Sequence, residues 1–228
     1  MNQVILKGNL GDAPNFISEE GKNPLCTFSV ATTERWKNDQ GEPQERTEWH
    51  RCVAFGKTSE LCREHLQKGS SVFLEGKSAT RQWKDQEGND RYTTEVVLSG
   101  FPDTLTNPGS KGINKIRIKG NLGADPEIRY TQDGNPVANF SVATTERWKD
   151  KEGKSQEKTE WHKCVAFGKI AEIASEHLTK GSKVLLDGKH ATRKWQDQGG
   201  KDRYTTEVVI SSLDILSWPQ TENSEGTN

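Results

Sequence analysis

The sequence predicts a mainly β protein built from two tandem copies of one small barrel. Three observations carry this prediction: the chain repeats itself once, each copy consists of short strand-like segments divided by turn residues, and each copy has a single helix-like segment. Only 30% of the 228 residues are hydrophobic. A composition this polar suits two thin cores better than one large core.

The internal repeat covers nearly the whole chain. FSVATTERWK occurs at 28–37 and again at 140–149, and RYTTEVV occurs at 91–97 and again at 203–209, so one offset of 112 residues aligns both pairs. A repeat of this length is a complete small domain rather than a solenoid unit.

The segments between the repeats differ from them in composition. PDTLTNPGSKG carries Pro, Gly, Ser and Asn without apolar periodicity, which is typical of a linker, and the end SWPQTENSEGTN is polar. The predicted parts are a first domain at 1–101, a linker at 102–112, a second domain at 113–216 and a short polar tail at 217–228.

The order of elements in each copy defines the type of barrel. In the second copy we predict strands at 115–122, 137–148, 159–167, 182–195 and 203–211. Between the third and fourth strands, 169–178 has apolar residues at helical spacing and is followed by a Lys-Gly pair that ends a helix. Five strands with one helix in this position are the order of an OB-fold, a small Greek-key barrel.

The third strand of each copy carries the most informative pattern. Alternation places Trp49, Arg51, Val53 and Phe55 on one face and His50, Cys52 and Ala54 on the other. The second copy repeats the first set as Trp161, Lys163, Val165 and Phe167. A core face would bury the cation unpaired, so the pattern favours an open platform on which bases stack and cations meet phosphates.

Further Trp residues stand beside Lys or Arg close to loops, which favours their exposure. The clusters are Arg35-Trp36-Lys37, Arg81-Gln82-Trp83-Lys84, Arg147-Trp148-Lys149 and Arg193-Lys194-Trp195. For Tyr92 and Tyr204, core and platform positions are equally consistent with the pattern. The net charge is −1, from 32 Lys plus Arg and 33 Asp plus Glu, so nucleic-acid binding would depend on this local arrangement of cations.

Catalytic and metal chemistry are less well supported. Glu48 with His50, and Glu160 with His162, share strand faces, but no nucleophile or Gly-rich phosphate loop accompanies them. The four cysteines lack zinc-site spacing and fit free thiols in a reducing cytoplasm. We therefore predict a cytoplasmic binding protein that is not an enzyme and has no cofactor and no metal; no apolar run is long enough for a membrane span.

Several ordered motifs together resemble the bacterial single-stranded DNA-binding protein (SSB) family, in its two-OB-domain type. They are NKIRIKGNLGADPEIRY, TEWHKCVAFGK, AEIASEHLTKGS and TRKWQDQ followed by DRYTTEVV. The resemblance implies OB-folds that bind and protect single-stranded DNA without sequence preference in DNA replication, recombination or repair, in the nucleoid. RNA would bind by the same stacking chemistry unless the 2′-OH is read.

The resemblance, together with the cationic flanks, assigns residues to roles. The stacking residues are Trp36, Trp49, Phe55, Trp83, Trp148, Trp161, Phe167 and Trp195. The phosphate-binding residues are Arg35, Lys37, Arg51, Lys57, Lys68, Arg81, Lys84, Arg147, Lys149, Lys163, Lys169, Lys180, Arg193 and Lys194. His50 and His162 match the position of a subunit-interface histidine. Gln82 replaces the cation at Lys194, so the second copy is expected to bind more strongly.

Assembly and partners follow from the same resemblance. Single-domain members form tetramers, so a two-domain chain is expected to reach four OB-folds as a homodimer. The chain ends in SEGTN and lacks the acidic, aromatic-tipped tail that recruits replication and recombination proteins, which would then bind another surface. The alternative is a primosome-type accessory or mobile-element OB protein that mainly bridges partners. Carbohydrate binding, which OB-folds also perform, is disfavoured by the cations beside the Trp residues.

Overall fold

The computed structural model describes residues 1–104, 111–150, 152–197 and 200–217. Most of the predicted linker and all but the first residue of the predicted tail lie outside these residues. In the described ranges, no helix is long and apolar enough to cross a membrane.

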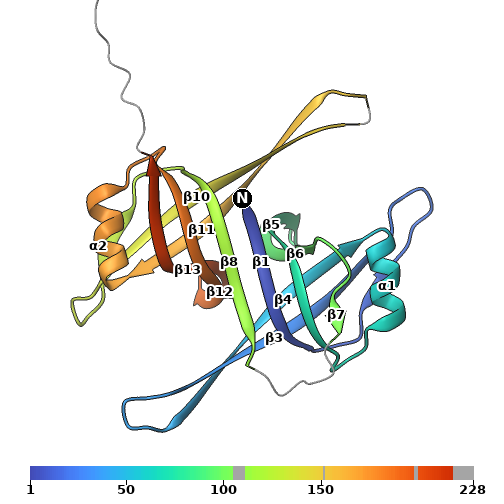
Figure 1. Ribbon diagram of the computed structural model, residues 1–228, viewed down its shortest axis with the longest axis horizontal. Coiled ribbons are helices and arrows are strands. Elements are labelled where there is room, and N and C mark those ends of the chain that lie inside the picture. Colours follow the sequence, from blue (N-terminus) through green and yellow to red (C-terminus); the bar gives the residue numbers. More distant parts are fainter. Residues whose placement is uncertain (105–110, 151, 198–199, 218–228) are drawn as a thin grey trace, which may run out of the picture. The chain divides into compact units, whose positions relative to one another are not determined.

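The first repeat consists of seven strands and one helix. They are β1 (Asn2–Leu10), β2 (Asn15–Ile17), β3 (Leu25–Lys37), β4 (Pro43–Phe55), α1 (Lys57–His65), β5 (Ser71–Lys84), β6 (Asp90–Leu98) and β7 (Asp103–Thr104). The helix lies alongside the strands of its own repeat (Figure 1). The positions of the strands and the helix agree with the predicted OB-fold order.

Strand pairing closes the first repeat into a barrel. β1 pairs antiparallel with both β3 and β5, β3 pairs antiparallel with β4, and β5 pairs antiparallel with β6. The ring is completed by a short parallel pairing of β4 with β6, in which Cys52 is opposite Val96 and Val53 is opposite Val97. The OB-fold prediction is confirmed.

The second repeat has the same architecture. Its elements are β8 (Ile113–Leu122), β9 (Glu127–Tyr130), β10 (Pro136–Lys149), β11 (Ser155–Phe167), α2 (Gly168–His177), β12 (Lys183–Gln196) and β13 (Asp202–Ser217). Each of the five predicted strands and the predicted helix is present. The strand order β8-β12-β13-β11-β10-β9, with an additional pairing of β8 with β10, again closes a barrel.

Two differences from the predicted elements have a common cause. β9 was not predicted, and β11 begins at Ser155, where a charged loop was expected. Both segments are exposed on nearly every residue, so they lack the alternation of apolar and polar residues that reveals a half-buried strand.

The core of each barrel comes from one face of its strands. In β1 the buried residues include Val4 and Leu6, and Gly8 lies between them and the end of the strand. A Cβ on Gly8 would lie 2.1 Å from the carbonyl oxygen of Ala31, so this glycine permits the close crossing of β1 and β3 that the barrel requires. Gly120 has the same relation to Ala143 in the second repeat.

All four cysteines are free and buried, including Cys52 and Cys164 on the inward faces of β4 and β11. Burial raises the pKa of the Cys62 thiol to about 12. These thiols pack as small core residues, as the strand pattern predicts.

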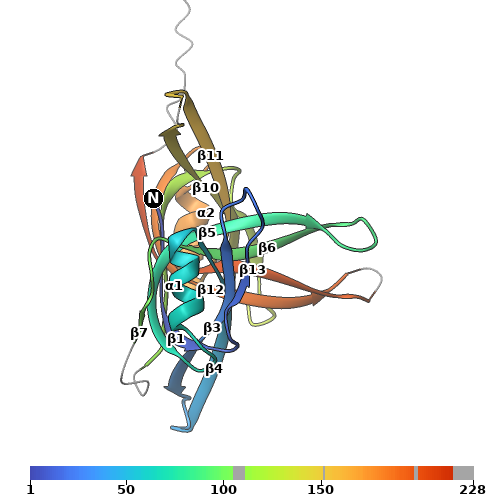
Figure 2. The same ribbon diagram turned by 90° about the vertical axis from the view of Figure 1, so that its right-hand side faces the viewer.

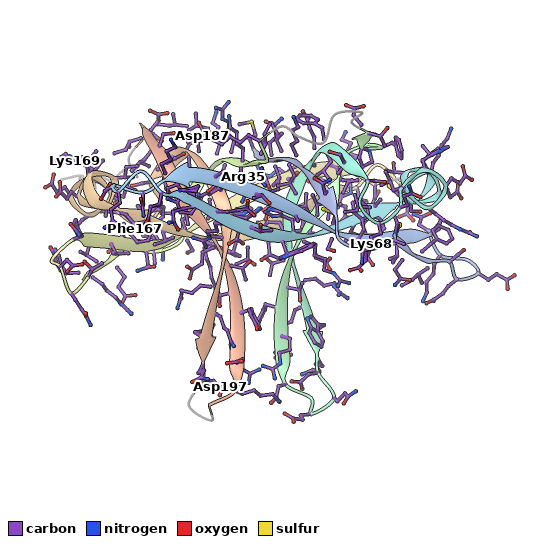
Figure 3. All side chains as sticks on the ribbon, turned by 90° about the horizontal axis from the view of Figure 1, so that it is seen from below. Arg35, Lys68, Phe167, Lys169, Asp187 and Asp197 are labelled. Atoms are coloured by element: carbon purple, nitrogen blue, oxygen red, sulfur yellow. The ribbon has the colours of Figure 1, made fainter. Side chains whose placement is uncertain are left out.

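Two long hairpins extend from the first barrel as ribbons, β3–β4 and β5–β6. Their pairing continues to Lys37 opposite Pro43 and to Lys84 opposite Asp90. The β5–β6 hairpin is seen as a long ribbon in Figure 2, and the β12–β13 hairpin of the second repeat has the same form, with Asp197 near its tip (Figure 3). These ribbons carry much of the candidate site.

Candidate nucleic-acid interface

The eight aromatic residues predicted to stack are all exposed. Their exposed fractions run from 42% for Trp83 and Trp195 to 58% for Trp49, and corresponding residues of the two repeats differ by 5 percentage points at most. Large aromatic side chains are among the residues that folding normally buries. An equal set on the surface of both repeats therefore indicates a binding surface.

Strand parity separates this surface from the core. In β4, Trp49, Arg51 and Phe55 are exposed, whereas His50 is buried. One part of the expected platform is wrong: Val53 is only 4% exposed, because β4 pairs with β6 at this residue. Val165 of β11 is likewise 6% exposed. The valines therefore pack within the face instead of being open to a ligand.

The exposed face of β4 continues onto β5 and β6. Ala79 of β5 is opposite Glu95 of β6, and Glu95 immediately precedes Val96, the partner of Cys52. Parity therefore places Arg81 and Trp83 on the same side as Arg51. We call Trp49, Arg51, Phe55, Arg81 and Trp83 the platform face of the first repeat; the platform face of the second is formed by Trp161, Lys163, Phe167, Arg193 and Trp195.

Sequence neighbours on the ribbons are not neighbours in space. Arg35 and Lys37 have the parity of Trp49, so they lie on the opposite side of the β3–β4 ribbon from Trp36, which they flank in sequence. The Arg35 Nε donates to Glu45 Oε2 at 2.6 Å. In the second repeat, Arg147 and Lys149 have the same relation to Trp148, and Arg147 donates to Glu157 at 2.6 Å.

The same rule moves Lys84 and Lys194 away from the platform faces. Each is adjacent in its strand to the exposed Trp and so points to the other side, where Lys84 pairs with Asp90 at 3.1 Å and Lys194 with Asp202 at 2.6 Å. The replacement of Lys194 by Gln82 therefore leaves the platform faces matched. Stronger binding by the second repeat stays a prediction, without this support.

Tyr92 and Tyr204, which the sequence pattern left between core and surface, are 65% and 64% exposed. Tyr92 is opposite Gln82, so it lies on the side of the β5–β6 ribbon away from Trp83. The hairpin thus presents an aromatic residue on each side.

The remaining predicted cations flank the helices. Lys57 begins α1, and Lys169 lies in the first turn of α2, where it pairs with Glu172 at 3.1 Å. Lys169 lies near Phe167 at this end of α2 (Figure 3). Lys68 and Lys180 are exposed in the turn that follows each helix, and the Lys180 N–H donates to Asp125 Oδ1 at 2.7 Å.

Two contacts that sequence reasoning missed position the platform indoles. The Trp83 Nε1–H donates to Thr93 Oγ1 at 2.9 Å, and Trp195 donates to Thr205 at the same distance. The Trp49 ring lies against Gly11, since a Cβ there would be 2.4 Å from Cζ3. The repeated segment GNLG at 8–11 and 120–123 is the sequence signal that could have pointed to this glycine.

His50 and His162 are 6% and 5% exposed within a single chain. His50 Nε2 shares a hydrogen bond with Thr32 Oγ1 at 2.8 Å, and His162 does so with Thr144 at 2.9 Å. Burial lowers the pKa of both histidines to about 4. Their role at a subunit interface stays a prediction.

The carboxylates considered for catalysis are paired with neighbouring cations. Glu48 accepts from Arg46 at 3.0 Å, and Glu160 pairs with Lys158 at 2.7 Å. In the described part of the chain, no group of three His, Cys, Asp or Glu residues could hold a metal ion.

Replacing Gly11 by Ala should displace the Trp49 indole. The new Cβ would overlap the ring, which can swing into solvent, so we expect a cost to stability of about 1 kcal/mol and a clear change in near-ultraviolet circular dichroism. The matched control is Gly100→Ala, because nothing lies within 4 Å of a Cβ at Gly100. Identical spectra for the two variants would contradict the proposed seat.

Acidification from pH 6.5 to pH 4 should destabilise the fold through His50 and His162. Their folded pKa of about 4 is below the usual unfolded value, so the unfolded chain binds more protons in this window and the free energy of unfolding falls with pH. Each histidine contributes up to about 1.4 kcal/mol per pH unit. Urea unfolding of His50→Gln/His162→Gln should show a shallower dependence; a slope equal to that of the parent chain would refute the assignment.

Comparison with known proteins agrees with this geometry. A model of the single-strand binding protein family matches residues 1–102 and 113–216. The structure is similar to a deletion mutant of the single-stranded DNA-binding protein from Thermus aquaticus, with a TM-score of 0.78, 26% identity and coverage of 98% of each chain. It is also similar to the wild-type protein, with a TM-score of 0.76, 27% identity and coverage of 97% of this chain and 96% of that one. Because the family model matches both repeats and the barrels have the OB-fold, the chain belongs to the single-strand binding protein family.

Proposed function

We propose that the chain binds single-stranded DNA without sequence preference, through the platform face of each repeat. The observation that carries the proposal is the exposure of Trp49, Phe55 and Trp83 on the same strand faces as Arg51 and Arg81, with the second repeat alike. Stacking on an aromatic side chain contributes about 1–3 kcal/mol per base and tolerates any base. The family match and the similarity to the Thermus protein, which is described as single-stranded DNA-binding, support it.

The charges of the site fit this chemistry despite the net charge of −1. All fourteen predicted phosphate-binding residues are exposed. Arg51, Arg81, Lys163 and Arg193 lie on the platform faces themselves, where they would follow a backbone whose bases are stacked. The proposed activity involves no reaction and no cofactor.

The biological role that we propose is the coating and protection of single strands in replication, recombination or repair in the nucleoid. An accessory that mainly bridges other proteins remains the second candidate. It predicts weak DNA binding that a partner strengthens. Two matched aromatic sets favour direct binding, because a bridging role gives no reason to keep eight large side chains exposed.

Removal of platform tryptophans should weaken binding in proportion to the stacking lost. For Trp49→Ala/Trp83→Ala we expect a loss of at least tenfold in affinity for oligo(dT), since two stacking contacts are removed. Affinity of the parent chain should fall linearly on a log–log plot against salt. Fluorescence titration measures both, with Phe101→Ala, an exposed aromatic outside the platform face, as control.

A parent chain that shows no fluorescence quenching by long oligo(dT) at low salt would refute the proposed function. Equal affinities for Trp49→Ala/Trp83→Ala and Phe101→Ala would place the binding surface elsewhere.

We further propose that the chain forms a homodimer, which would bring four OB-folds together on one strand. The duplication of the domain and the family resemblance support this. Light scattering at micromolar concentration should give about 51 kDa, twice the chain mass of 25.5 kDa. A homogeneous particle of 25.5 kDa would contradict the proposal.

A further inference from the structure

A nearly buried carboxylate lies in the middle of the first platform face. Glu95 of β6 is only 8% exposed, although its parity places it on the same side as Arg51 and Arg81. A negative charge here opposes the binding of a polyanion, and burying a carboxylate is costly unless it is well paired. Its presence at this position therefore requires an explanation.

The contacts of Glu95 supply one. Its Oε1 accepts from the Arg51 Nε at 2.9 Å and lies 3.4 Å from the Arg81 Nε. The carboxylate is 10% exposed at its side chain, whereas the side chains of Arg51 and Arg81 remain 49% and 56% exposed. Two arginines from different strands are thus anchored at one inner oxygen through Nε while their outer parts stay open to solvent.

We propose that Glu95 is a positioning residue for DNA binding: it fixes the guanidinium groups of Arg51 and Arg81 in the orientation in which they meet phosphates. The inference rests on the proposed function. An arginine in solvent loses considerable side-chain entropy when it docks on a ligand. Anchoring through Nε removes part of that cost before DNA arrives, and the planar guanidinium still presents its terminal N–H groups.

Glu45 provides a matched comparison within the same repeat. It also pairs with an arginine of the site, Arg35, but both side chains of that pair are exposed, at 70% for Arg35 and 53% for Glu45. Exposed pairs hold their partners weakly. Glu45→Gln therefore removes the same charge near the DNA without removing a buried anchor.

The two roles of a carboxylate predict opposite signs. If Glu95 acted only through its charge, Glu95→Gln would bind DNA more tightly. If it positions the arginines, Glu95→Gln binds more weakly, by about fivefold, because charge-assisted contacts to two phosphates are partly lost. The slope of log affinity against log salt should also become shallower, by up to about 1.4 for two phosphates on a single strand.

The experiment isolates the first repeat in the full chain. A reporter chain carries Trp148→Phe, Trp161→Phe, Trp195→Phe and Trp218→Phe, so that fluorescence arises from Trp36, Trp49 and Trp83 alone. It is titrated with an oligothymidylate of about 10 nucleotides, within the site size of one OB-fold, at several salt concentrations. Glu95→Gln and Glu45→Gln are compared in this background, with circular dichroism and thermal unfolding to verify the fold.

A second set of variants tests whether Glu95 acts through the arginines. In a chain that already carries Arg51→Gln/Arg81→Gln, the positioning role predicts that Glu95→Gln no longer weakens binding. A purely structural role would persist in that background and would lower the unfolding temperature in parallel with affinity.

The expected result is weaker binding and a shallower salt slope for Glu95→Gln, equal or tighter binding for Glu45→Gln, and no further loss without the arginines. Equal or tighter binding by Glu95→Gln, or an undiminished loss without the arginines, overturns the positioning role alone. Absence of oligothymidylate binding by the unaltered chain overturns the proposed function, and this inference with it.

Discussion

The parallel pairing of β4 with β6 is the interaction on which the candidate site depends. Two residue pairs, Cys52 with Val96 and Val53 with Val97, close the first barrel and set the register between the β3–β4 and β5–β6 hairpins. A shift by one residue would turn every side chain of a strand to the other side. Trp49 would then point into the core, and Arg51 and Arg81 would no longer share Glu95.

The closed barrel also explains how a chain with a thin core can keep large aromatic side chains in solvent. The inward faces are filled by Val, Leu, Ile and Cys residues, and glycines such as Gly8 allow the strands to cross closely. The outward aromatics are then held by local contacts, namely Thr93 for Trp83 and Gly11 for Trp49. The binding surface is therefore largely preorganised, which lowers the entropy that a ligand must remove.

Electrostatics act locally in this molecule. The balance of 32 cations and 33 acids gives no basic excess, yet most predicted phosphate-binding arginines have a carboxylate partner that orients them. Arg35 with Glu45 and Arg51 with Glu95 differ in burial, from an exposed pair to one whose carboxylate is nearly inaccessible. Net charge alone would have pointed away from nucleic acid, whereas the position of each cation relative to the aromatics does not.

Much of the fold and part of the site could be predicted from the sequence. The offset of 112 residues, the strand alternation and the single helix per copy specify two OB-folds, because these patterns report burial directly. β9, the early start of β11 and the burial of Val53 could not be predicted, since they depend on pairing between strands distant in sequence. For the same reason, Lys84 and Lys194 were placed beside a Trp that lies on the other side of the ribbon.

The central claim is that single-stranded DNA lies on the platform faces, and photocrosslinking tests it most directly. An oligonucleotide that carries 5-iododeoxyuridine is irradiated with the full chain, and the crosslinked peptides are identified by mass spectrometry. The account predicts crosslinks at Trp49, Trp83, Trp161 and Trp195. Crosslinks confined to Tyr92 and Tyr204, on the other side of the hairpins, would contradict it.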